Sequence, residues 1–173
     1  PSINAEYYLL KDAVSGRILA EQGADERVEP ASITKVMTGY VVADQIDKGF
    51  ISGDEEVLIS EDCWRRGGSK MFIKEGTRVL VSDLIKGMVI QSGNDASCAL
   101  AEHTAGSEEG FVDLMMVYAR DLGLQNTNFT NVWGGPDEGH YSSARDLALL
   151  SQRLIEKFPD HYAIYKEKYF TYN

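Results

Sequence analysis

Ser32 and Lys35 stand three residues apart where a helix is expected to begin. Positions i and i+3 share a helix face, so the amine of Lys35 can reach the hydroxyl of Ser32. A serine hydroxyl is a weak nucleophile until a base removes its proton, and a lysine is such a base only where its pKa is lowered. The tetrad Ser32-Ile33-Thr34-Lys35 is weak evidence alone, because a chain of this length contains S-x-x-K by chance about once. A serine helix cap followed by a surface lysine is the alternative interpretation.

A second triplet, Ser92-Gly93-Asn94, falls between two expected helices. A hydroxyl and a carboxamide on such a loop can both face one cleft. Ser92 can relay a proton between Lys35 and a leaving amine, and Asn94 can hydrogen-bond a substrate carbonyl. The alternative is ordinary turn chemistry, in which Asn94 caps a helix.

The two motifs together resemble the first two of three motifs shared by penicillin-binding proteins and serine β-lactamases. Their surroundings are more specific. Residues 29–38, 91–96 and 139–147 resemble segments of the serine D-alanyl-D-alanine carboxypeptidases, the low-molecular-mass penicillin-binding proteins of proteobacterial type. The resemblance extends over essentially the whole chain.

This resemblance implies acyl transfer, with Ser32 as nucleophile, Lys35 as base, Ser92 as proton relay and Asn94 as substrate-positioning amide. The implied substrate is the peptidoglycan stem pentapeptide, from which the terminal D-alanine is removed. β-Lactams are implied to acylate the same serine. The sequence has no H-E-x-x-H, G-x-x-x-x-G-K or C-x-x-C motif, so we expect no metal and no cofactor. The resemblance implies a location in the periplasm, at the outer face of the bacterial inner membrane.

The third motif of the family, K-T-G, does not occur in the sequence. In the family it lies on a central strand beyond the point where this chain stops, as do the later strands and a membrane-attaching C-terminal segment. We therefore expect residues 1–173 to form the N-terminal portion of the penicillin-binding peptidase domain, with the remainder on a second polypeptide or lost. A β-lactamase-like hydrolase and a non-catalytic peptidoglycan-binding fragment remain the alternative functions.

The resemblance implies an α/β fold of the α+β type, with an antiparallel sheet flanked by helices and incomplete at the C-terminus. Gly106 and Gly123 are expected helix stops, whereas Ser82, Asn94 or Asp95, Ser107 and Ser143 are expected helix starts. The expected strands or short apolar pieces are 6–10, 17–21, 57–59, 71–73, 79–81 and 169–173, and the expected helices are 33–48, 82–90, 95–105, 107–122 and 144–158.

The formal net charge of −10 argues against a nucleic-acid partner, because phosphate binding needs clustered Lys and Arg. Cys63 and Cys98 have no metal-ligand spacing, and a bridge and two separate thiols remain equally open. His140 precedes a helix start, where packing is favoured over substrate contact. The sequence contains no run of eighteen apolar residues.

Overall fold

The computed structural model describes residues 3–172. Four short strands lie in the first half of the described chain and helices make up the second half, which confirms the mixed helix-and-sheet class. In chain order the elements are β1 (Tyr8–Lys11), β2 (Ile18–Gln22), η1 (Ala31–Ile33), α1 (Thr34–Asp47), β3 (Glu56–Leu58), α2 (Glu61–Arg65), β4 (Arg78–Leu80), α3 (Val81–Gln91), α4 (Asn94–Ala105), α5 (Glu108–Leu122), α6 (Ala144–Lys157), α7 (Pro159–Ala163) and η2 (Ile164–Lys166).

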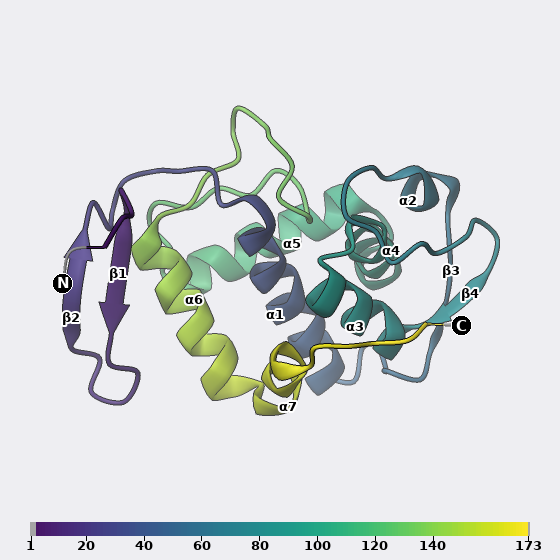
Figure 1. Cartoon of the computed structure of the whole chain (residues 1–173). Helices are drawn as coiled ribbons and strands as arrows, with labels where there is room; N and C mark the ends of the chain where they lie inside the picture. The colour runs from purple at the N-terminus through teal and green to yellow at the C-terminus, as the bar shows by residue number, and fades with distance from the viewer. Residues whose placement is uncertain (1–2, 173) are drawn as a thin grey trace.

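Helix α1 is the centre of the molecule, with α3 and α4 on one side of it, α6 on the other and α5 behind (Figure 1). Its sequence has apolar residues on more than one side, and ten of its fourteen residues are buried. A helix that is apolar around most of its circumference must be surrounded by other elements. The prediction that this helix is well buried is therefore confirmed.

Two separate antiparallel pairs of strands lie on opposite sides of the molecule (Figure 1). The β1–β2 pair is the hairpin expected around residues 12–16, with Leu9 opposite Glu21. The β3–β4 pair joins strands that are distant in sequence, with Val57 opposite Val79. Val81 was expected at the end of the second of these strands, but it is the first residue of α3.

Helix starts follow the sequence signals in part. Ser107 and Ser143 are N-caps, and their hydroxyls accept hydrogen bonds from the backbone N–H groups of Gly110 and Asp146. The predictions for Ser82 and Asn94 were wrong, because α3 is preceded by Leu80 and α4 by Gly93, neither of which caps with a side chain.

The apolar piece 71–73 is not a strand, contrary to expectation. Its backbone N–H groups donate to the buried carboxylate of Asp95, at 2.8 Å from Met71, 2.9 Å from Phe72 and 3.3 Å from Ile73. Phe72 has a φ of +66°, which is incompatible with a regular strand. A side chain thus takes the place of a neighbouring strand as the hydrogen-bond acceptor.

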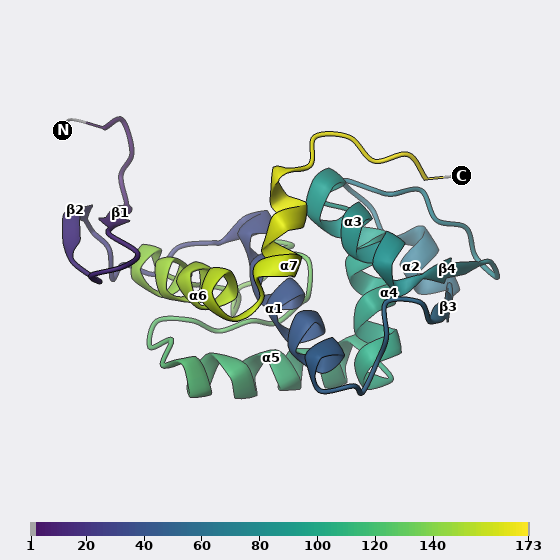
Figure 2. The same cartoon turned by 90° about the horizontal axis from the view of Figure 1, so that it is seen from below.

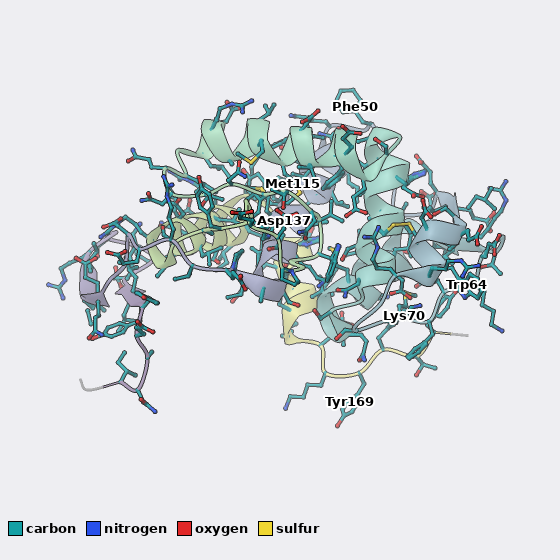
Figure 3. All side chains as sticks on the ribbon, turned by 90° about the horizontal axis from the view of Figure 1, so that it is seen from above. Phe50, Trp64, Lys70, Met115, Asp137 and Tyr169 are labelled. Carbon is teal, nitrogen blue, oxygen red and sulfur yellow. A yellow bond between two sulfur atoms is a disulfide. The ribbon has the colours of Figure 1, made fainter. Side chains whose placement is uncertain are left out.

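The C-terminal segment also departs from expectation. Helix α7 begins with Pro159, and a proline at the first helical position was a start signal that the sequence analysis did not use. Residues 169–172 form no strand, and Asn173 lies outside the described residues. Figure 3 shows Tyr169 pointing away from the body of the molecule, and 90% of its surface is exposed.

A buried carboxylate ties α1 to its neighbours. Asp44 accepts hydrogen bonds from Lys157 of α6 at 2.5 Å, from Lys48 at 2.7 Å, and from the hydroxyl of Tyr118 of α5. Burial raises the pKa of Asp44, but these donors outweigh it and hold the pKa below its usual value. The charge is therefore paired, as a buried charge must be to be tolerated.

Cys63 of α2 and Cys98 of α4 form a disulfide, with their Cα atoms 5.3 Å apart. This result decides between the two interpretations that the sequence left open. Among residues 3–172 the two sulfur atoms and Glu102 are the one group with metal-ligand proximity, but disulfide sulfurs are not thiolate ligands. None of the helices described combines the length and the apolar character needed to cross a bilayer.

Removing the bridge with Cys63→Ala and Cys98→Ala together should lower the free energy of unfolding by about 2–4 kcal/mol. The reason is that the bridge closes a loop between cysteines 35 residues apart and so restricts the unfolded chain. Urea unfolding followed by circular dichroism measures the change, with the reduced wild type as a second reference. Equal midpoints for the oxidised wild type and the double variant would contradict this prediction.

Candidate active site

Ser32 lies in the 3-10 turn η1, directly before α1, rather than in the first turn of α1 itself. The amine of Lys35, in the first turn of α1, donates to Ser32 Oγ over 3.3 Å. The same amine donates to the backbone carbonyl of Trp133 over 2.8 Å. The contact between serine and lysine predicted from their spacing is therefore present, and a carbonyl from a distant loop orients the lysine.

Burial lowers the pKa of Lys35 to about 8, from a usual value of 10.5, and it is the sole cause of the shift. Only 5% of the residue is exposed, and no carboxylate is paired with its amine among the described residues. At pH 7.5 about a quarter of such an amine is neutral, which is roughly two hundred times the neutral fraction of an ordinary lysine. Lys35 can thus accept a proton near neutral pH.

Ser92 ends α3 in the left-handed conformation, with a φ of +57°. It lines a cavity of about 80 Å³ together with Ser32, Lys35 and residues of α1, α3 and η2. Its Oγ is buried and has no hydrogen-bond partner among the described residues. A buried hydroxyl without a partner costs free energy, and such groups often serve in catalysis.

Asn94 is placed differently from the other three candidates. It is the first residue of α4, and its side-chain N–H donates to the carbonyl of Gly67 over 2.8 Å. Its backbone N–H donates to the backbone carbonyl of Ser69 over 2.7 Å. The 67–70 loop thus borders this motif, but Asn94 does not line the cavity of Ser32 and Lys35. Its substrate-positioning role stays a prediction.

The loop of residues 130–140 docks along the first turns of α1. Thr38 donates to the carbonyl of Val132 over 2.7 Å, and Thr34 is hydrogen-bonded to His140 Nε2 over 2.8 Å. The N–H of Thr130 donates to His140 Nδ1, so we assign the histidine proton to Nε2. Burial lowers the pKa of His140, which is consistent with a neutral packing role.

Asn131 fixes the turn that presents the Trp133 carbonyl to the lysine. Its Oδ1 accepts hydrogen bonds from the N–H groups of Trp133 at 3.3 Å, Gly134 at 2.7 Å and Gly135 at 3.0 Å. Gly134 has a φ of +85°, and a Cβ there would stand 1.8 Å from the carbonyl oxygen of Ala31. The turn therefore also packs on the backbone next to Ser32.

Neither Trp133 nor Asn131 was predicted from the sequence as part of the site. Trp133 acts through a backbone carbonyl, for which no side-chain type is a signal. Asn131 followed by Gly134 and Gly135 did carry a signal, because Asn and Gly together are typical of tight turns. That signal predicts a turn but not its contact with Lys35.

The mixed helix-and-sheet fold and the Ser32–Lys35 pair are typical of the penicillin-binding class that the two sequence motifs resemble. Comparison with known proteins agrees with this class. A family model described as D-alanyl-D-alanine carboxypeptidase matches residues 1–173, so the chain belongs to the D-alanyl-D-alanine carboxypeptidase family.

Among its relatives, D-alanyl-D-alanine carboxypeptidase DacC of Escherichia coli is 49% identical over 100% of this chain and 45% of its own length. DacA of Haemophilus influenzae is 46% identical, again over 100% of this chain and 45% of the relative. The chain thus spans somewhat less than half the length of these curated relatives.

Solved structures give the same result. Penicillin binding protein 5 from Haemophilus influenzae superposes with a TM-score of 0.98 at 45% identity, over 100% of this chain and 51% of that one. Penicillin binding protein 6B from Escherichia coli gives 0.96 at 43% identity, over 100% and 56%. The resemblance noted in the sequence is confirmed, and so is the fold class.

Replacing the buried lysine should stabilise the fold. The depressed pKa means that Lys35→Met removes a desolvation cost of about 1–3 kcal/mol below pH 8, after allowance for the lost bond to Trp133. The gain should shrink between pH 8 and 10.5, because the folded lysine is already neutral there while the unfolded one is still charged. Urea unfolding at pH 7 and pH 10 measures it, and a pH-independent difference would contradict the assignment.

Asn131→Ala should loosen the turn that holds the lysine, because three N–H groups lose their acceptor. We expect amide hydrogen exchange at residues 133–135 to accelerate at least about tenfold, equivalent to about 1.4 kcal/mol of local stability. Asn131→Asp is the matched control, since it keeps an acceptor oxygen and should retain most of the protection. Unchanged exchange in the alanine variant would refute the role of Asn131.

Proposed function

We propose that residues 1–173 are the N-terminal portion of a serine D,D-carboxypeptidase domain and carry its nucleophile. The proposal names Ser32 as the acylated residue, Lys35 as its base, Ser92 as a proton relay and Asn94 as a substrate-positioning amide. One observation carries it: a lysine amine lies 3.3 Å from the serine hydroxyl with its pKa lowered to about 8. The names of the relatives support the same activity.

In acylation, neutral Lys35 takes the proton of Ser32 while Oγ bonds to the carbonyl carbon between the two terminal D-alanines. The carbon–nitrogen bond then breaks. The proton passes from Lys35 to the leaving amine through Ser92, whose unpartnered hydroxyl lines the same cavity. D-Alanine leaves, and Lys35 is neutral again.

In deacylation, a water molecule attacks the ester carbonyl, and Lys35 accepts the proton from the water. The bond between carbon and Oγ breaks, and the proton returns to Ser32. A β-lactam forms the corresponding acyl-enzyme when Oγ opens its ring. The same base serves both steps, so both need Lys35 in its neutral form.

The full activity requires more than this chain supplies. The relatives are more than twice as long as their matched regions, and we propose that the K-T-G element is supplied from outside these 173 residues. A contiguous segment or a second polypeptide would both serve. The proposed partners are the peptidoglycan stem peptide and β-lactams, with no nucleic acid and with membrane contact only through a C-terminal segment.

The proposed location is the periplasm, at the outer face of the bacterial inner membrane. The Cys63–Cys98 disulfide supports it, because disulfides persist in oxidising compartments. Cell-wall remodelling takes place in the same compartment, where the proposed substrate is found.

Intact mass spectrometry before and after penicillin tests the proposal, with Ser32→Ala as control. We expect one adduct on Ser32, and none in the control. The rate of adduct formation should rise with pH through about 8, because the neutral amine is the reactive form and the pKa of Lys35 is lowered to that value.

The same spectra reveal whether a second polypeptide accompanies the chain. An adduct on a residue other than Ser32 would contradict the assignment of Ser32 as the nucleophile. No adduct in a sample extended to the length of the relatives would refute the proposed function.

A further inference from the structure

The C-terminal segment crosses the nucleophile helix. Helix α7 and the turn η2 lie over α1 and reach α3 (Figure 2). This crossing brings Tyr165 into the wall of the cavity that holds the serine and the lysine. The cavity is lined by Ser32, Lys35, Val36, Met88, Val89, Ser92 and Tyr165. Tyr165 is the one lining residue that comes from neither η1, α1 nor the α3–α4 corner, and the proposed mechanism gives it no role.

A glycine on α1 leaves room for α7 and η2 to pack closely against the helix. Gly39 lies one helical turn after Lys35, on the same face. A Cβ at Gly39 would stand 2.7 Å from His161 Nε2 and 3.4 Å from the Tyr165 hydroxyl. The rings of His161 and Tyr165 meet edge to face, with centroids 5.9 Å apart. The tyrosine hydroxyl therefore lies against α1 at Gly39, one helical turn after the lysine.

The two aromatic side chains that pack on α1 at Gly39, His161 and Tyr165, carry no charge. Burial lowers the pKa of His161 to about 4. Tyr165 is 38% exposed as a residue, but its hydroxyl lies against α1, where burial raises its pKa to about 12, so both side chains are neutral across the pH range of interest. The other groups that face the amine are the Ser32 hydroxyl and the Trp133 carbonyl. His140 reaches α1 only through Thr34 and is also neutral. Tyr165 thus acts on Lys35 by excluding water, not by charge.

We propose that Tyr165 is a positioning residue whose ring, seated on α1 by Gly39, closes the cavity of Ser32, Lys35 and Ser92 and keeps water from the lysine amine. The inference deepens the proposed function, on which it rests for the role of Lys35 as base. Without the ring the amine becomes hydrated, and a hydrated lysine holds its proton at neutral pH.

The test reads Lys35 directly. Protein labelled with ¹³C at lysine Cε is titrated by NMR, and Lys35→Met assigns the signal. We expect a pKa of about 8 in the wild type. Tyr165→Ala should raise it by at least about one unit towards the ordinary value, whereas Tyr165→Phe should leave it unchanged because the ring remains. Tyr169→Ala is the matched control, since Tyr169 is exposed and lies outside the cavity.

Gly39→Ala gives a second variant that keeps the tyrosine. Alanine favours a helix over glycine by about 1 kcal/mol, so α1 should persist while the new methyl group displaces His161 and Tyr165. We expect the pKa of Lys35 to rise as in Tyr165→Ala. If Tyr165→Ala is unfolded by circular dichroism, Gly39→Ala decides alone. A pKa that stays at the wild-type value in a folded Tyr165→Ala or Gly39→Ala overturns the inference.

Penicillin adduct formation on the same samples separates this inference from the proposed function. If both hold, the pH at which acylation is half-maximal should move upward with the pKa of Lys35 in Tyr165→Ala and not in Tyr165→Phe. If the wild type extended to the length of the relatives forms no adduct but the pKa of Lys35 still responds to Tyr165, the role of the Tyr165 ring is confirmed and the proposed function fails. If the pH of half-maximal acylation moves as far in Tyr165→Phe as in Tyr165→Ala, the proposed role of the Tyr165 ring is overturned.

Discussion

The burial of α1 is the constraint on which the rest of the structure depends. The helix is covered by α3, α4, α5 and α6, and most of its residues are inaccessible. A lysine in its first turn is covered with it, and loss of hydration alone lowers the pKa of that lysine to about 8. The lowered pKa of Lys35 is therefore a consequence of how completely the core surrounds one helix, not of a nearby charge.

The contacts that hold the fold also hold the site. The loop after α5 lies along α1 through threonine hydroxyls, a neutral histidine and the lysine itself. The carbonyl of Trp133 accepts a hydrogen bond from the amine. Asn131 fixes the turn that holds this carbonyl, because its Oδ1 accepts hydrogen bonds from three backbone N–H groups. A rigid turn keeps a lysine in one orientation at little cost at the moment of reaction, which is the advantage of a preorganised site.

Unfavourable features gather around Ser32. Lys35 is desolvated, Ser92 Oγ is buried without a partner, and Ala31, next to Ser32, has a φ of +47°. Each costs on the order of 1–3 kcal/mol and persists only where the surroundings enforce it. The single large core, the paired charge of Asp44 and the Cys63–Cys98 bridge offset these costs elsewhere. Such an exchange of stability for reactivity is typical of active sites.

The sequence by itself determined the central helix, the hairpin at the start, the caps at Ser107 and Ser143, and the proximity of Ser32 to Lys35. These features depend on local spacing, which 3.6 residues per turn converts directly into contact. Only the tertiary structure decided that Cys63 and Cys98 are linked and that Asp95 replaces a strand as the partner of residues 71–73. It also decided that Trp133 accepts a hydrogen bond from the lysine and that Tyr165 lines the same cavity as the lysine. Each of these brings together residues far apart in the chain, through a disulfide, a carboxylate, a backbone carbonyl or an aromatic side chain. Residue type and spacing do not predict such long-range partners, because the packing of the whole core determines which residues meet.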